Sequence, residues 1–235
     1  MNEAPQHPQA GEATDRAFWW GLGGLVVLAF AVRLVYLFQI EPMPFFYHPV
    51  ADAAADWTWA GRIARGDWLG SETLYQAPAY PYFLALMRLT LGADLWRVRL
   101  VQMVLGAVSC GLLALAGRWF ISRSAGWCAG VVVALYAPAM FFDGLIQKAA
   151  LSFFLMALLL CLLGWMARGA HGTVEGSGRG SRALAAATAL AVGVVSGLLA
   201  LTHEQTLVLG PVLLVWLMAP IDRVACPSSP TASAG

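Results

Sequence analysis

Charged side chains are scarce in this sequence: Asp, Glu, Lys and Arg together make up 11% of its 235 residues. Hydrophobic residues make up 60%, and the mean hydropathy is +0.69, well above what is typical of a soluble domain. The composition therefore excludes an ordinary soluble protein and indicates an integral membrane protein. The net charge of +1, without any basic cluster, also gives no reason to expect a nucleic-acid partner.

Cysteine is scarce as well, and its four residues lie far apart at positions 110, 128, 161 and 226. The sequence has no CxxC pair and no histidine at the spacing of a zinc site. The first three cysteines fall in apolar segments, where cysteine packs as a small hydrophobic side chain. We therefore expect buried thiols rather than disulfides or thiolate-bound metal.

Long apolar runs predict an all-α polytopic membrane protein with about six transmembrane helices. The expected spans are residues 17–40, 98–120, 125–142, 149–167, 183–201 and a shorter 207–220. Residues 80–91 are apolar but too short to cross a bilayer, so we expect a helix that lies at the membrane surface or dips into the membrane. Residues 1–16 and 222–235 have the composition of disordered tails, and the glycine-rich stretch 168–182 is typical of a flexible connector.

Arginine and acidic residues separate onto opposite sides of these spans. The loops on the N-terminal side carry Arg118, Arg123, Arg168, Arg179, Arg182 and Arg223. The opposite side carries Asp52, Asp56, Asp67, Glu72, Asp94, Asp143 and Glu204. The positive-inside rule then places the N-terminus in the cytoplasm and residues 41–99 in an external loop. Arg33 lies within the first span, and we expect its long side chain to reach toward the membrane surface.

The external loop concentrates charge beside the membrane, where charge is costly and usually functional. An alanine-rich helix is expected from residue 51, and Asp52, Asp56 and Trp59 share one face because they recur at helical spacing. Asp52 falls in the first turn, where the helix dipole favours an anion. Its carboxylate can accept a proton from an acceptor hydroxyl or hold a divalent metal ion, or it can merely stabilise the helix start.

Three further polar residues lie on the same outer side. Asp143 and Lys148 stand between the third and fourth spans, where the lysine can hold a phosphate facing the aspartate, or the two can form an ion pair. His203 follows the fifth span, and it is either a catalytic candidate or a polar turn residue. Spacing alone does not choose between these alternatives.

Four segments in order carry a family resemblance: VADAAADWTWAGRIARGDWLG, QAPAYPYFLAL, VRLVQMVLGAVSCGLLALAGRWF and ALYAPAMFFDGLIQKAALSFF. They resemble the N-terminal half of bacterial GT-C-fold glycosyltransferases of the protein O-mannosyltransferase and aminoarabinose-transferase kind. The likeness covers roughly residues 18–220, within a GT-C-like membrane domain expected at 17–221. Its most specific parts are Asp52 with Trp59 and Ala60, the Gly-Asp-Trp at 66–68, and the Ala-Pro-x-Tyr-Pro at 77–81.

The resemblance implies an inverting enzyme that takes a sugar from a polyprenyl-phosphate donor at the outer face of the bacterial inner membrane. Asp52 would be the general base or an electrostatic partner in the active site. Arg97, Arg99 or Lys148 would neutralise the leaving phosphate. The full set of expected substrate-binding residues is Asp56, Trp59, Tyr80, Arg97, Arg99, Asp143, Lys148 and His203.

The sequence also departs from that family. Lys148 stands near the place of a second acid, and Ala53 follows Asp52 where some relatives have an acidic pair. Where relatives often have a threonine followed by a basic residue, Thr202 is followed by His203 and Glu204. Relatives continue through several more spans, so we expect a fragment, a truncated gene product, or one half of a two-chain assembly whose partner supplies the missing helices. The alternatives are a non-catalytic binding or assembly protein and a small transporter, although the sequence has no internal repeat. The sequence specifies neither the sugar nor the acceptor.

Overall fold

The computed structural model describes residues 9–68, 77–172, 179–208, 210–212 and 215, and no β-strand occurs among them. This confirms the all-α prediction. The helices, in chain order, are α1 (Gln9–Ile40), α2 (Asp52–Ala64), α3 (Ala79–Leu91), α4 (Leu95–Phe120), α5 (Arg123–Leu135), α6 (Ala137–Gly144), α7 (Lys148–Gly172), α8 (Arg179–Thr202) and the 3₁₀ helix η2 (Glu204–Val208).

Four helices in the described residues are long and apolar enough to cross a membrane, and the bent pair α5–α6 makes up to five spans. The four are Arg16–Ile40, Leu95–Phe120, Lys148–Arg168 and Ala183–Thr202. These lengths and compositions indicate a membrane-embedded protein. Six spans are not confirmed, because most of the sixth expected span, 207–220, lies outside the described residues.

Helix boundaries differ from the sequence predictions in three places. Helix α1 begins at Gln9 rather than at residue 17. The helices α7 and α8 both extend into the expected connector 168–182, of which residues 173–178 lie outside the described part. Alanine, Arg and Glu in these stretches are good helix formers and let a helix continue past its apolar run. The expected tail 222–235 lies entirely outside the described residues.

The third expected span is broken rather than continuous. Tyr136 adopts an extended backbone with φ −74° and ψ 103°, and α5 and α6 meet there at 54°. Pro138 lies in the first turn of α6, where a missing N–H costs nothing. In a continuous helix the amide of residue 138 would donate to the carbonyl of Ala134, so proline leaves that carbonyl without its helical partner.

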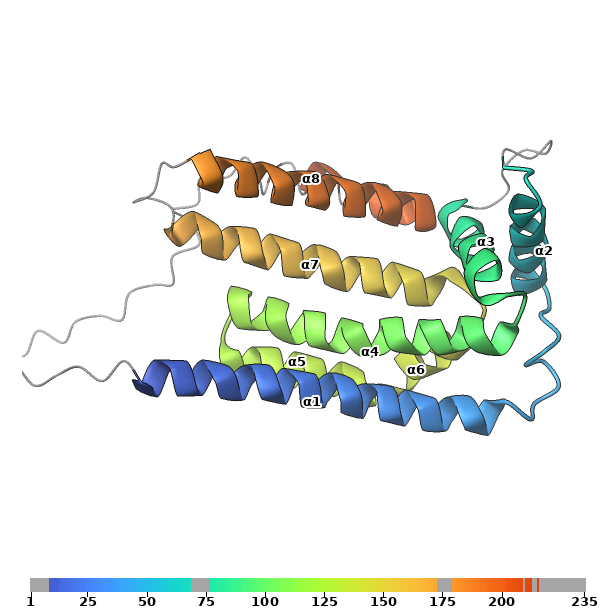
Figure 1. Ribbon diagram of the computed structural model, residues 1–235, viewed down its shortest axis with the longest axis horizontal. Coiled ribbons are helices and arrows are strands. Elements are labelled where there is room, and N and C mark those ends of the chain that lie inside the picture. Colours follow the sequence, from blue (N-terminus) through green and yellow to red (C-terminus); the bar gives the residue numbers. More distant parts are fainter. Residues whose placement is uncertain (1–8, 69–76, 173–178, 209, 213–214, 216–235) are drawn as a thin grey trace, which may run out of the picture.

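The long helices lie side by side, with α4 between α1 and α7 (Figure 1). Small residues permit the close approach of α4 and α5: a Cβ on Gly126 would lie 2.3 Å from the carbonyl oxygen of Ala114. Helix α8 packs on α7 through an apolar cluster that includes Leu159, Val195 and Leu199. This bundle supports the shorter helices α2 and α3.

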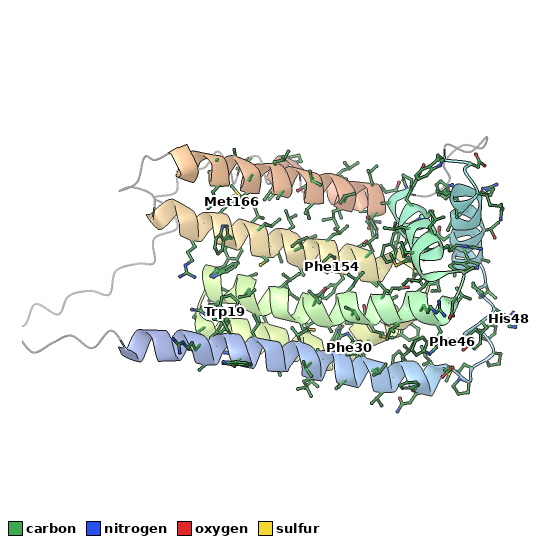
Figure 2. All side chains as sticks on the ribbon, in the orientation of Figure 1. Trp19, Phe30, Phe46, His48, Phe154 and Met166 are labelled. Atoms are coloured by element: carbon green, nitrogen blue, oxygen red, sulfur yellow. The ribbon has the colours of Figure 1, made fainter. Side chains whose placement is uncertain are left out.

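Helices α2 and α3 lie together at one end of the bundle, and α2 runs across the direction of the long helices (Figure 1). Phe46 and His48 lie at this same end, whereas Trp19 lies toward the other (Figure 2). A buried apolar cluster joins α2 and α3 to the ends of α4 and α7 and includes Ala60, Ile63, Leu84 and Ile146. The helix expected at 80–91 is therefore confirmed as α3. Its place at the end of the bundle fits a membrane-surface position.

Candidate functional site

A pocket of about 240 Å³ opens where the first turn of α2 faces the turn between α6 and α7. Its polar lining comes from Asp52 of α2, Arg99 of α4 and Gln147 of the α6–α7 turn. Apolar side chains, including Phe45 and Ile146, line the rest. We call this feature the polar pocket, because it brings a carboxylate and a guanidinium to one opening.

Asp52 is exposed and occupies the first turn of α2, as its position in the sequence predicts. The residue before it, Ala51, has φ 52° and ψ −128°. A positive φ is uncommon for a residue with a Cβ, and such conformations cost about 1–3 kcal/mol and cluster at functional sites. The chain therefore enters α2 through a strained residue that itself lines the polar pocket.

Asp56 lies one turn further along α2 and is only 5% exposed. The pKa of its carboxyl is raised to about 6, mainly by burial and also by the charge of Asp52, while the charge of Lys148 opposes the shift. The two aspartates and the lysine at the start of α7 therefore lie within electrostatic range of one another. A carboxyl with a pKa near neutrality is suited to exchange protons.

Tyr80 of α3 is buried beside these groups, and its hydroxyl donates to Oε1 of Gln102 at 3.4 Å. Burial raises the pKa of the Tyr80 phenol well above its usual value; the charge of Asp56 adds to the shift, and Arg99 opposes it. Tyr80 is thus a neutral hydroxyl that connects α3 to α4 within the site.

Arg99 and Gln102 hold the α6–α7 turn in place from α4. Arg99 Nε donates to the carbonyl of Gly144 at 2.8 Å, and Gln102 Nε2 donates to the carbonyl of Leu145 at 2.7 Å. The Arg99 guanidinium also stacks over the Phe46 ring at 4.1 Å. Because its position is set by these contacts, Arg99 presents a fixed positive charge to the polar pocket.

An apolar groove of about 470 Å³ runs between α3, α7 and α8. Its walls include Phe83, Leu151 and Leu198. Leu151 follows Lys148 by three residues on α7, so one helical turn separates the cation from the groove. Helix α3 and the start of α7 therefore contribute both to the polar site and to an apolar surface beside it.

Five of the residues predicted from the sequence come together at this end of the bundle: Asp52, Asp56, Tyr80, Arg99 and Lys148. Of the nine predicted residues, only Asp52 and Arg99 line the polar pocket itself. Contact between these side chains and a substrate stays a prediction.

Three other predicted residues have different surroundings: Trp59, Arg97 and His203. Trp59 packs against the apolar cluster between α2 and α3. Arg97 has a side chain that is 57% exposed and pairs with Asp94 at 3.2 Å. His203 follows α8, where its backbone amide donates to the carbonyl of Leu199. None of the three lines the polar pocket.

The expected environments of Asp143 and Arg33 are wrong. Asp143 does not face Lys148; its Oδ2 accepts from Nε of Arg33 at 2.9 Å, and the two side chains are 3% and 0% exposed. Arg33 therefore does not reach the membrane surface. The physical reason is the break at Tyr136, which redirects α6, and the proximity of Gly106, where a Cβ would lie 2.1 Å from Asp143 Oδ2.

Gln102, Gln147 and Gly106 belong to this region but were not singled out from the sequence. A glutamine and a glycine inside an apolar run were the available signals, because a buried amide needs partners and a glycine permits close approach. Among the residues described, no group of three His, Cys, Asp or Glu side chains is placed to hold a metal ion.

Comparison with known proteins finds no match among protein-family models, curated proteins or solved structures. The chain is therefore not assigned to a family. The GT-C resemblance rests on sequence motifs alone.

Proposed function

We propose that this chain is a membrane glycosyltransferase, or the N-terminal half of one, that moves a sugar from a polyprenyl-phosphate donor to an acceptor hydroxyl. The observation that carries the proposal is the polar pocket, in which Asp52 and the buried Arg99 face one opening. Lys148 adds a second positive charge near Asp56. The motifs shared with GT-C-fold enzymes support the same reaction class.

The chemistry requires one base and a stabilised leaving phosphate. The acceptor oxygen attacks the anomeric carbon and forms the new glycosidic bond, while the bond from that carbon to the phosphate oxygen breaks. The electron pair leaves with the polyprenyl phosphate, and the hydroxyl proton passes to a carboxylate. We assign the base to Asp52, and the charges that stabilise the departing phosphate to Arg99 and Lys148.

The apolar groove supports a lipid-linked donor rather than a water-soluble one. A polyprenyl-phosphate sugar needs an apolar surface for its chain next to a polar site for its head group. The groove between α3, α7 and α8 lies one helical turn from Lys148, so the structure supplies both environments on neighbouring elements.

The test is sugar transfer in proteoliposomes that contain the full chain, a panel of polyprenyl-phosphate sugars radiolabelled in the sugar, and a bacterial membrane extract that supplies acceptor hydroxyls. With the wild-type protein we expect the label to leave the lipid fraction. With Asp52→Asn we expect the label to remain there. The matched control is Asp94→Asn, because Asp94 is a partly exposed helix cap and asparagine caps equally well. Transfer by Asp52→Asn at the wild-type rate would reject Asp52 as the base.

Two other outcomes separate the alternatives. Binding of radiolabelled polyprenyl phosphate without transfer from any donor would favour a non-catalytic binding protein. Absence of both binding and transfer would overturn the proposal. In a small transporter Arg33 and the outer acids would line a path, whereas Arg33 is buried in an ion pair with Asp143.

A further inference from the structure

The Arg33–Asp143 pair lies inside the membrane-spanning part of the bundle, seven residues before the end of α1. Two charges buried there are expensive to desolvate, and a pair of apolar side chains of similar size would often stabilise a protein equally well. The pair is therefore poorly explained by stability alone. Its contacts indicate a role in setting geometry.

Arg33 connects three helices through one guanidinium. Its Nη1 donates to the carbonyls of Ala29 in α1 and Ala134 in α5, at 3.3 and 3.4 Å, while its Nε donates to Asp143 in α6. The Ala134 carbonyl is the one that Pro138 leaves without a helical donor. Arg33 thus satisfies the break between α5 and α6 and fixes the direction in which α6 leaves it.

Helix α4 accommodates the pair at a single glycine. A Cβ on Gly106 would lie 2.1 Å from Oδ2 of Asp143 and 2.8 Å from Nε of Arg33. No larger residue fits there without displacing the ion pair. The pair is therefore held on the α4 side by shape as well as by hydrogen bonds.

Asp143 leads directly into the polar pocket. The next two carbonyls, of Gly144 and Leu145, are those that Arg99 and Gln102 bind. Gln147 then lines the pocket, and Lys148 begins α7. Because Gln147 follows Asp143 so closely in the chain, a rotation of α6 would move the α6–α7 turn and the acceptor that positions Arg99.

We propose that Arg33, Asp143 and Gly106 are positioning residues that hold the α6–α7 turn, and with it Arg99 and Gln147, in the geometry of the polar pocket. The proposal concerns the shape of the pocket and goes beyond the reaction proposed above. It can therefore stand or fall independently of glycosyl transfer.

The test compares the pocket's shape with the protein's stability. Gln147→Cys, in a background with the native cysteines replaced by alanine, reports pocket geometry through its rate of reaction with a water-soluble maleimide. Asp143→Leu and Arg33→Met each leave one buried charge unpaired, and we expect each to lower the melting temperature and change the labelling rate several-fold. The double variant Arg33→Met/Asp143→Leu removes both charges, and it should recover the melting temperature while its labelling rate stays altered.

Two further variants distinguish a change in pocket shape from a loss of stability. Phe18→Ala weakens the buried cluster around α1, α4 and α5, and it should lower the melting temperature without changing the labelling rate at position 147. Gly106→Ala introduces no charge but displaces the pair, and it should alter labelling as the double variant does. The reference is Gln147→Cys with Arg33, Asp143 and Gly106 unchanged. If the labelling rates of the double variant and of Gly106→Ala both equal the rate of this reference, the positioning role is rejected and the pair serves stability alone.

Discussion

Asp52 and Asp56 lie one turn apart on α2, yet Asp52 is exposed at the polar pocket and Asp56 is 5% exposed. The same helical face therefore carries two carboxylates in different environments. Burial and the charge of Asp52 raise the pKa of Asp56 to about 6, close enough to neutrality for this carboxyl to take up and release a proton. A buried carboxyl whose pKa is raised in this way is suited to acid–base chemistry.

The raised pKa of Asp56 predicts that the protein loses stability as the pH rises. A carboxyl whose folded pKa is raised from 3.8 to about 6 favours the folded state below pH 4, and this contribution is lost as the pH rises through 6. The cost above pH 6 is about 3 kcal/mol. We expect Asp56→Asn to be more stable than the wild type at pH 7.5 and to lose that advantage at pH 4. Melting temperatures of both proteins across this range would test it, and parallel curves would contradict it.

Gly106 predicts a large effect from one methyl group. Gly106→Ala places a Cβ against the Arg33–Asp143 pair, and overpacking of this kind costs about 1–3 kcal/mol. Gly193 of α8 is the matched control, because its Cβ would meet nothing within 4 Å, and Gly193→Ala should be neutral or slightly stabilising. Thermal denaturation in detergent distinguishes the two. Equal melting temperatures for both variants would refute the close packing at α4.

Arg88 is expected to lock α3 onto α2. Its Nη1 donates to the carbonyl of Trp57 at 2.8 Å, and its guanidinium lies 4.2 Å from the centre of the Trp57 ring. Such contacts are each worth about 0.5–2 kcal/mol, so Arg88→Ala should speed amide hydrogen exchange in α2. Arg97→Ala removes only an exposed pair and should leave that exchange unchanged. Equal exchange in both variants would argue against this role.

The orientation predicted from arginine placement can be tested at two exposed positions. Thr58 lies on α2 at one end of the bundle, and Ile121 lies between α4 and α5 at the other (Figure 1). With the N-terminus in the cytoplasm, a cysteine at 58 should react with an impermeant reagent in intact cells, and one at 121 only after permeabilisation. The reverse pattern would invert the topology.

Local patterns anticipated much of the fold because they depend on short-range physics. The apolar runs predicted the long helices, and the four- and three-residue spacing placed Asp52, Asp56 and Trp59 on one helix. The break at Tyr136 was missed although Pro138 was visible, because a proline in an apolar run can either kink a helix or begin a new one.

Sequence patterns did not predict the contacts between residues that are far apart in the chain. Arg33 and Asp143 are 110 positions apart, and no periodicity links them. Long arginines near the ends of spans usually reach toward the surface, so the general rule pointed the wrong way. Packing around Gly106 decided the outcome.

The amino-acid order by itself determined that the chain forms apolar helices and that Asp52 begins a helix, since both follow from hydrophobicity and helical period. Only the tertiary structure decided which charges lie near one another: Lys148 within electrostatic range of Asp56, Arg99 at the polar pocket, and Arg33 paired with Asp143. The physical reason is that helix period sets the face a residue occupies, whereas the partner facing it depends on how closely separate helices pack.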